Sequence, residues 1–203
     1  MISKEMERNI KANGGIREAF NEARRQKTVY GEENVFDLSI GNPSAPAPRK
    51  VVDVIKKLSE NVNLDHQYMC ESGYEEVRSK IAGWMNKKYK TSYGINNIIM
   101  TNGVAGGLNM VLRALLNPGD EVLVFRPYYP AYIGFAENWN GKIIEVDPGE
   151  DFQPDFEDLE GKITKRTKVV IVNSPHNPTG VIYTKETATK ISEILKSKQK
   201  EYG

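Results

Sequence analysis

Short apolar runs alternate with longer amphipathic segments along most of the chain. A run such as Val-Leu-Val-Phe is apolar at consecutive positions, which is typical of strands that helices cover on both faces of a sheet. Turn residues such as Pro118 and Gly119 bound these runs. We therefore predict four strands, at Asn97–Met100, Glu121–Phe125, Lys142–Val146 and Lys168–Val172.

Between the runs, apolar residues recur at intervals of three and four positions, which indicates helices with one buried face. Leu108, Val111, Leu112 and Leu115 show this spacing. A further strand-like run is Val35–Ile40. We predict helices at Ile16–Lys27, from Val51 to Leu58, after Gly73, and at Val104–Leu116, Ala131–Trp139, Asp155–Gly161 and Lys185–Lys200.

The alternation predicts an α/β fold, a three-layer αβα sandwich with a mostly parallel sheet. The segment Gly41–Pro48 has too many prolines for a helix or a strand, and we place a domain boundary near it. Residues 1–45 are then an N-terminal arm with part of a small domain, and residues 46–203 belong to a large domain. In such folds ligands bind at the carboxyl ends of the strands, which directs attention to the loops there.

Composition narrows the function classes. The 28 Lys and Arg residues nearly balance 27 Asp and Glu residues, whereas nucleic-acid binders and polybasic membrane binders usually carry a basic excess. We find no apolar run of membrane-spanning length and no signal-peptide pattern, so we expect a soluble cytoplasmic protein. Cys70 is the only cysteine, and His66 and His176 have no ligand-spaced partners, so we expect no metal site.

Two loops after predicted strands could bind a planar anionic ligand. Thr101–Gly107 leads into a helix whose free N–H groups and dipole favour an anion, although the same glycines also suit tight packing of the helix on a strand. This loop fits neither the dinucleotide fingerprint nor the phosphate-loop motif. In Arg126–Tyr132, two prolines hold tyrosines that could stack on a heteroaromatic ring or simply cap the core.

Two further loops carry polar chemistry. In Asn173–Gly180, prolines lie on both sides of Asn177 and hold its amide for a directed hydrogen bond. His176 in the same loop could act as a base, but a packing role is the commoner one. In Asp37–Pro43, Gly41 could offer its N–H group to a carboxylate or could simply form a tight turn.

Taken together, these loops resemble the class I and II aminotransferases of the fold-type I pyridoxal-phosphate enzymes. The resemblance extends from Asp37 to the end of the chain. It rests on L-S-I-G-N-P, T-N-G-V-A-G-G-L, N-P-G-D-E-V-L-V, P-Y-Y-P-A-Y and N-S-P-H-N-P-T-G. By this resemblance, residues 46–203 form the N-terminal part of the large domain that binds pyridoxal phosphate.

The resemblance implies roles for individual positions. Gly103, Val104 and Ala105 match the cup that holds the cofactor phosphate, but two positions that often carry hydroxyl or basic side chains are Val104 and Ala105 here. Tyr129 matches the aromatic residue that stacks on the cofactor ring, and Asn177 matches the asparagine that hydrogen-bonds the ring oxygen.

Two further matches lie earlier in the chain. Gly41 matches the residue near the substrate carboxylate. Tyr68 matches a tyrosine that reaches the cofactor of the neighbouring subunit, which implies a homodimer. The reaction implied is amino transfer between an amino acid and a 2-oxo acid.

The family's catalytic lysine and its ring-nitrogen aspartate have no match within residues 1–203. We expect the lysine beyond Gly203, so this chain is read as an N-terminal portion that does not catalyse alone. The family's seven-stranded sheet takes strands from the other half, so this half would leave unpaired inner edges and an uncovered core.

Other functions remain open on the residues. A C–S lyase, a synthase or a decarboxylase of the same fold could share these motifs, as could a non-catalytic relic or the aminotransferase-like sensing domain of a regulator. No DNA-binding pattern supports the regulator, and a generic nucleotide-binding module is disfavoured by the missing fingerprints. The identity of the amino acid cannot be inferred from these positions.

Overall fold

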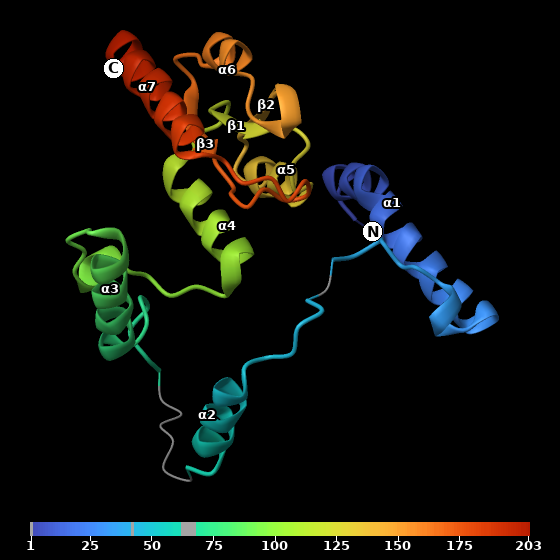
Figure 1. The fold of residues 1–203 in the computed structure, drawn as a ribbon. Helices are drawn as coiled ribbons and strands as arrows, with labels where there is room; N and C mark the ends of the chain where they lie inside the picture. The colour runs from blue at the N-terminus through green and yellow to red at the C-terminus, as the bar shows by residue number, and fades with distance from the viewer. Residues whose placement is uncertain (1, 42, 62–67) are drawn as a thin grey trace. The chain divides into compact units, whose positions relative to one another are not determined.

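The computed structural model describes residues 2–41, 43–61 and 68–203 (Figure 1). The chain divides into two compact units, Met1–Met100 and Thr101–Gly203. The predicted boundary near residue 45 remains a prediction, because these units reflect only contacts within the 203 residues.

The first unit is helical in its described part. Ser3 caps the first helix by accepting a hydrogen bond from the N–H group of Met6 at 3.1 Å, and Gly31 ends this helix with φ of 88°. The predicted helix Ile16–Lys27 is therefore too short at both ends. The helices of this unit are α1 (Lys4–Tyr30), η1 (Glu32–Asn34), α2 (Arg49–Ser59), α3 (Glu75–Tyr89) and η2 (Ile95–Asn97).

Two extended segments of the first unit are not strands. In the strand-like run after α1, Phe36 is 91% and Leu38 is 94% exposed. The predicted strand Asn97–Met100 is also absent, because η2 takes up its first residue and Ile98–Met100 pairs with no strand among the described residues. The N–H group of Met100 instead donates to the Ser72 carbonyl at 2.9 Å. An apolar run becomes a strand only where a neighbouring strand satisfies its backbone.

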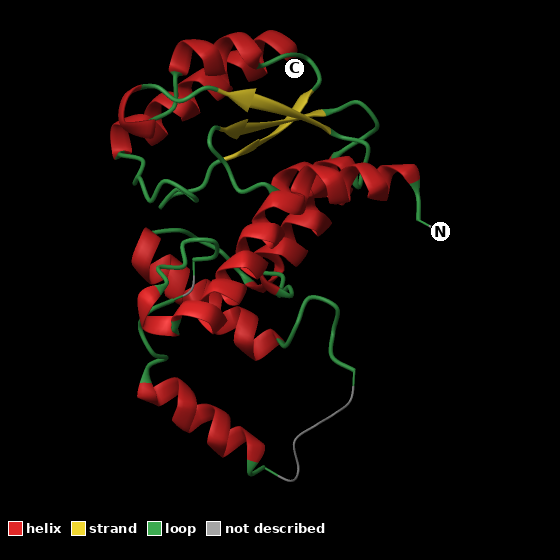
Figure 2. Ribbon diagram, turned by 90° about the vertical axis from the view of Figure 1, so that its right-hand side faces the viewer, coloured by secondary structure: helices red, strands yellow, loops and turns green. Residues whose placement is uncertain are grey.

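The second unit contains a parallel sheet covered by helices on both faces. Its three strands have the order β2-β1-β3 and run in one direction (Figure 2). The elements are α4 (Gly103–Leu115), β1 (Glu121–Phe125), α5 (Ala131–Glu137), β2 (Lys142–Val146), η3 (Glu150–Phe152), α6 (Phe156–Lys162), β3 (Thr167–Ile171) and α7 (Lys185–Tyr202).

The two sides of β1 build the two halves of the core. Leu123 and Phe125 point to one face, where buried residues of α6 and α7 pack against them. Val122 and Val124 point to the other face, where buried residues of α4 and α5 pack. Alternating orientation along a strand produces this arrangement. The predicted α/β fold is confirmed, and the parallel sheet is the middle one of three layers, between two layers of helices.

A buried carboxylate marks the amino end of β1. Glu121 is 2% exposed, and its carboxylate accepts hydrogen bonds from Thr164 Oγ1 at 2.6 Å and from Arg166 Nη2 at 2.8 Å. Burial alone would raise the pKa of Glu121, but these hydrogen bonds bring it below its ordinary value. The carboxylate therefore links β1 to the turn before β3.

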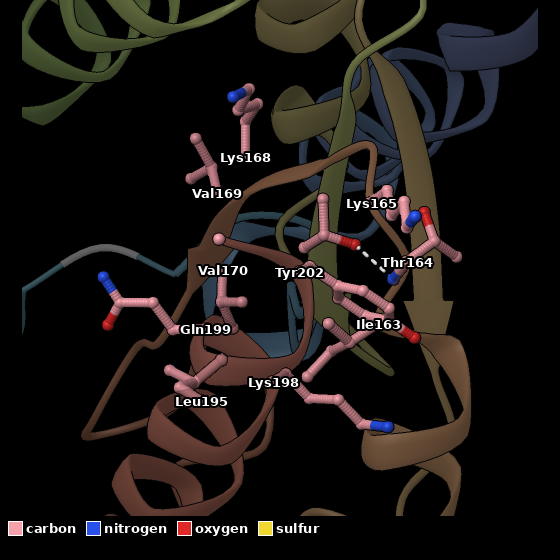
Figure 3. Close-up of a pocket in the computed structure, with 12 residues that line it drawn as sticks. Ile163, Thr164, Lys165, Lys168, Val169, Val170, Leu195, Lys198, Gln199 and Tyr202 are labelled. Atoms are coloured by element: carbon pink, nitrogen blue, oxygen red, sulfur yellow. Dashed lines mark hydrogen bonds between the residues drawn. The ribbon is translucent and has the colours of Figure 1, made fainter.

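In the described part of the chain, β3 has β1 on one side and no strand on the other. A hollow follows this outer edge of β3 and the end of α7 (Figure 3). Its lining includes Val170, Leu195 and Tyr202 as well as lysines at positions 165, 168 and 198. The expectation of unpaired inner edges and an uncovered core stays a prediction.

Among the described helices, we find none that is long and apolar enough to cross a membrane. The described residues also contain no group of three His, Cys, Asp or Glu side chains placed to hold a metal ion.

Candidate functional site

Two of the sequence-predicted loops lie at the carboxyl edge of the sheet, and a third leads into a helix that begins on that side. Because β1 and β3 are parallel, the loops that follow them, 126–130 and 173–180, lie at the same edge. Helix α4 runs back along the sheet: Leu116, just past its end, lies beside Gly141, which precedes β2. The first turn of α4 therefore points toward the carboxyl edge as well.

The first turn of α4 is shaped as an anion site. Gly103 has φ of 71°, a left-handed conformation that favours glycine. Asn102 makes no side-chain capping bond, so the side chain before the helix does not occupy the N–H groups of Val104 and Ala105. Val104 is 77% exposed, and together with the helix dipole this leaves the turn open to a phosphate.

A small side chain is also needed one turn further along α4. A Cβ atom on Gly107 would lie 3.1 Å from Thr101 Oγ1, and that hydroxyl donates to the Gly103 carbonyl at 3.0 Å. Gly107 therefore allows close packing of α4 on its own loop, and the phosphate role of this turn stays a prediction.

Tyr129 offers an aromatic ring after β1. Tyr129 is 43% exposed, and its ring meets the Tyr132 ring edge to face, with centroids 5.7 Å apart. Tyr132 itself is 8% exposed, and burial raises the pKa of its phenol. Tyr132 therefore caps the core, whereas Tyr129 keeps a ring surface available for stacking.

The loop after β3 holds Asn177 through its backbone. The Asn177 N–H group donates to Asn173 Oδ1 at 2.9 Å, and Ser174 Oγ accepts from the Tyr183 N–H group at 2.9 Å. Both X–Pro bonds of this loop, at Pro175 and Pro178, are cis. The side chain of Asn177 is exposed at the edge, where its amide can meet a ligand.

His176 is buried and holds this loop against the core. It is 5% exposed, its Nδ1 lies 2.9 Å from Thr179 Oγ1, and its ring stacks on Tyr183 with centroids 5.7 Å apart. Burial lowers the pKa of His176 despite a hydrogen bond with the Phe125 backbone. A buried neutral imidazole with these contacts fits the packing role rather than that of a base.

Gly41 and Tyr68 belong to the first unit. The turn before Gly41 is held by Asp37, whose carboxylate accepts from Ser39 Oγ at 2.6 Å and from Lys27 Nζ at 3.1 Å. These bonds lower the pKa of Asp37 to about 2. Gly41 is exposed with open space around it, and Tyr68 is fully exposed. The implied roles of both residues stay predictions.

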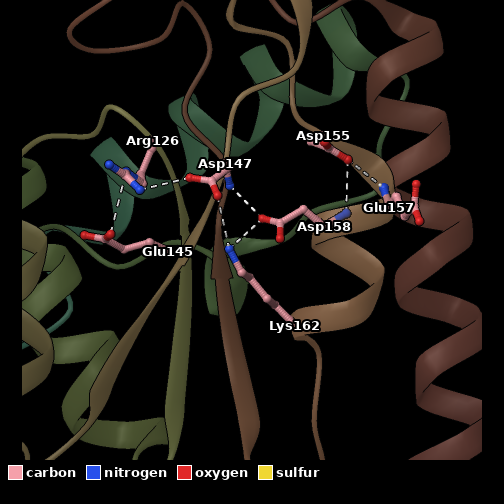
Figure 4. Close-up of polar contacts among 7 residues, drawn as sticks. All are labelled: Arg126, Glu145, Asp147, Asp155, Glu157, Asp158 and Lys162. Atoms are coloured by element: carbon pink, nitrogen blue, oxygen red, sulfur yellow. Dashed lines mark hydrogen bonds and ion pairs between the residues drawn. The ribbon is translucent and has the colours of Figure 1, made fainter.

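One polar network near the site could not be predicted from the loop motifs of the sequence. Arg126 bridges two carboxylates at the end of β2, Glu145 and Asp147, and Lys162 of α6 contacts Asp147 and Asp158 (Figure 4). Tyr128 also donates to Glu145 at 2.6 Å. The only sequence signal is the acidic pair Glu145 and Asp147 directly at the end of an apolar run.

The arrangement suits a flat ligand that carries a phosphate. The first turn of α4 provides N–H groups for the phosphate, Tyr129 provides a ring face, and Asn177 provides an amide for an oxygen on the ligand ring. Pyridoxal phosphate has these three features, so the residues present fit it.

Comparison with known proteins places the chain in a family. The family described as aminotransferase class I and II matches residues 33–200, and the chain belongs to this family. This confirms the resemblance inferred from the loops.

Individual relatives agree with this assignment. A probable aspartate aminotransferase of Methanocaldococcus jannaschii is 34% identical over 92% of this chain and 47% of its own length. A glutamate-pyruvate aminotransferase of Haemophilus influenzae is 32% identical over 80% of this chain and 41% of its own. A crystal structure of an aminotransferase from Eubacterium rectale superimposes with a TM-score of 0.91 at 38% identity, over 100% of this chain and 52% of that one. The chain thus spans about half the length of its relatives.

Proposed function

We propose that this chain forms the cofactor-binding part of a pyridoxal-phosphate-dependent aminotransferase, which moves an amino group between an amino acid and a 2-oxo acid. The observation that carries the proposal is that three ligand features are directed toward one edge of the sheet. These are the open first turn of α4, the exposed ring of Tyr129 and the rigid loop around Asn177.

Each feature has a part in holding the cofactor. The N–H groups of Val104 and Ala105 would bind the phosphate, while Gly103, whose own N–H group donates to the Thr101 carbonyl at 2.8 Å, shapes the turn. Because Val104 and Ala105 lack hydroxyl or basic groups, backbone and dipole carry this contact. Tyr129 would stack on the ring, and the amide of Asn177 would donate to the ring oxygen. When bound, pyridoxal phosphate supplies an electron sink for the substrate's α carbon.

Other parts of the proposal concern the whole protein. Gly41 would bind the substrate carboxylate, and Tyr68 would reach the cofactor of a second subunit, so the active protein would be a homodimer in the cytoplasm. The lysine that holds the cofactor covalently and moves the α proton has no match within residues 1–203, so these residues alone would be inactive. The relatives' names make aspartate, and glutamate with pyruvate, the substrates to test first.

The proposal is tested by chemical mapping. The purified 203-residue chain is mixed with pyridoxal phosphate, reduced with borohydride and mapped by mass spectrometry. We expect no single stoichiometric adduct, because the exposed lysines of α7 lack the burial that would activate them. A stoichiometric adduct on one lysine of residues 1–203 would overturn the assignment of the catalytic lysine.

A second experiment measures aminotransferase activity, and it uses the active polypeptide that contains these residues. We expect transfer of an amino group from aspartate or glutamate to a 2-oxo acid. Asn177→Ala should lower this activity at least tenfold, since a hydrogen bond to the cofactor ring is lost, about 1.4 kcal/mol or more. Lys196→Ala, on the exposed face of α7, serves as the matched control.

A further inference from the structure

Glu145 contacts the loop after β1, which carries Tyr129 of the candidate cofactor site. It is the fourth residue of β2 and pairs with Val124 of β1, so its side chain lies beside the loop that leaves β1. One oxygen of its carboxylate accepts from Tyr128 Oη at 2.6 Å. The other oxygen lies 3.6 Å from Arg126 Nε (Figure 4). Both residues flank Pro127 in this loop.

From Tyr128 a chain of ring contacts leads to Tyr129. The Tyr128 ring lies nearly parallel to the Tyr132 ring, with an interplanar angle of 10° and centroids 6.3 Å apart. The Tyr129 ring meets Tyr132 from another side, at 89°. Since Tyr132 is packed in the core, its ring gives both neighbouring rings a fixed surface to pack against.

The bond at the start of this chain is short, and its acceptor, the Glu145 side chain, is 46% exposed. A phenol that donates to a carboxylate at this short distance forms a charge-assisted hydrogen bond. Burial and the Glu145 carboxylate both raise the pKa of Tyr128, so the phenol keeps its proton over the working pH range. Tyr128 is therefore a permanent donor.

We propose that Glu145 is a positioning residue for the cofactor: through Tyr128 and Tyr132 it fixes the plane of the Tyr129 ring at the carboxyl edge of the sheet. The inference rests on the proposed function, because it assigns the Tyr129 ring to the bound cofactor. Glu145 itself does not touch that ring.

The test uses the holoenzyme with Tyr128→Phe, Glu145→Leu and Glu145→Gln. The readouts are the visible circular dichroism of bound pyridoxal phosphate and its dissociation rate. Asp147→Asn is the matched control, because it weakens the Arg126 and Lys162 contacts of the same network and leaves the Tyr128–Glu145 bond in place.

We expect Tyr128→Phe and Glu145→Leu to change the dichroic band and to speed dissociation about threefold to tenfold, the effect of one lost hydrogen bond to a charged group. Glu145→Gln keeps an acceptor oxygen and should restore much of both properties. The double variant Tyr128→Phe with Glu145→Leu should lose no more than either single variant, because both remove the same bond.

Contrary results have distinct meanings. If wild-type holoenzyme retains pyridoxal phosphate while all three variants match it in dichroism and dissociation, the positioning role is wrong. If Asp147→Asn has the same effect as Glu145→Leu, the network acts as general support for the loop, and the specific path through Tyr128 is wrong. If the wild-type protein binds no pyridoxal phosphate, the proposed function itself fails.

Discussion

At the scale of single residues, the loop after β3 depends on one buried imidazole. His176 contacts Thr179, Tyr183 and the Phe125 backbone, so it ties the candidate ligand loop to the core beneath it. The phenol oxygen of Tyr183 is buried with no hydrogen-bond partner among the described residues, and burial raises the pKa of Tyr183 to about 12. The loop depends on a neutral imidazole, because burial disfavours the charged form of His176.

This dependence predicts a loss of stability in weak acid. The pKa of His176 in the folded protein lies below its ordinary value of 6.5, so the unfolded chain takes up a proton more readily as the pH falls through that value. We expect the free energy of unfolding, measured with urea, to decrease between pH 7.5 and pH 5.5. His176→Gln should be less stable at pH 7.5 and should show a smaller decrease.

His66→Gln provides the comparison, since it removes the second histidine of the chain. An unchanged pH dependence in His176→Gln, or its loss in His66→Gln, would contradict the assignment to His176.

At the scale of elements, the first turn of α4 requires a glycine at position 103 because of its backbone conformation, and not because a side chain would lack space. A Cβ atom on Gly103 would meet nothing within 4 Å, but its φ of 71° is strained for any other residue. Gly106 has an ordinary helical position, and a Cβ atom there would make a normal contact at 3.6 Å with Asn102. The two glycines form a matched pair with opposite expectations.

We predict that Gly103→Ala lowers the free energy of unfolding by about 1 kcal/mol and weakens pyridoxal-phosphate binding, because the first turn must change shape. Gly106→Ala should leave stability unchanged or raise it by up to about 1 kcal/mol, since alanine favours a helix. Urea unfolding and cofactor titration of both variants check this. Equal effects at the two positions would show that the conformation of Gly103 is unimportant.

The elements also show which features a sequence can predict. The runs at Glu121–Phe125 and Lys142–Val146 become strands as predicted, because helices bury both faces of the sheet and the apolar pattern records that burial. The run at Asn97–Met100 has the same pattern but no partner strand in the described chain. The local sequence does not determine whether a run will have a strand to pair with. Helix α1 extends beyond its apolar pattern because Ser3 and Gly31 set its ends.

The site divides in the same way. Tyr129 and Asn177 could be predicted from proline-bounded loops, whereas the role of Glu145 requires the register that places β2 beside β1. A contact between residues 128 and 145 depends on a crossover that no local motif reports.

At the scale of the whole molecule, the described residues expose apolar surface beside an edge of β3 that no described strand covers. Val172 is 49% exposed and lines the apolar face of α7 next to β3. Open edges of this kind pair with other chains. We predict that the purified 203-residue chain self-associates at micromolar concentration, as measured by analytical ultracentrifugation.

Val172→Lys should reduce this association, because a charge at a sheet edge opposes pairing. Thr189→Lys, an equal change of charge at an exposed position of α7, should not. A wild-type chain that stays monomeric at all concentrations would contradict the prediction.

The buried carboxylate of Glu121 has a consequence for the order of folding. Strand β1 meets β2 only after the chain has continued to Lys142, and the Glu121 carboxylate meets Arg166 across a sequence separation of 45 residues. The chain loses the entropy of closing such a loop before the contacts between its ends form, and this slows folding. Until Arg166 and Thr164 arrive, the carboxylate keeps its water. Its dehydration is therefore a late event, and a kinetic probe at Glu121 would report when the central strand has acquired both neighbours.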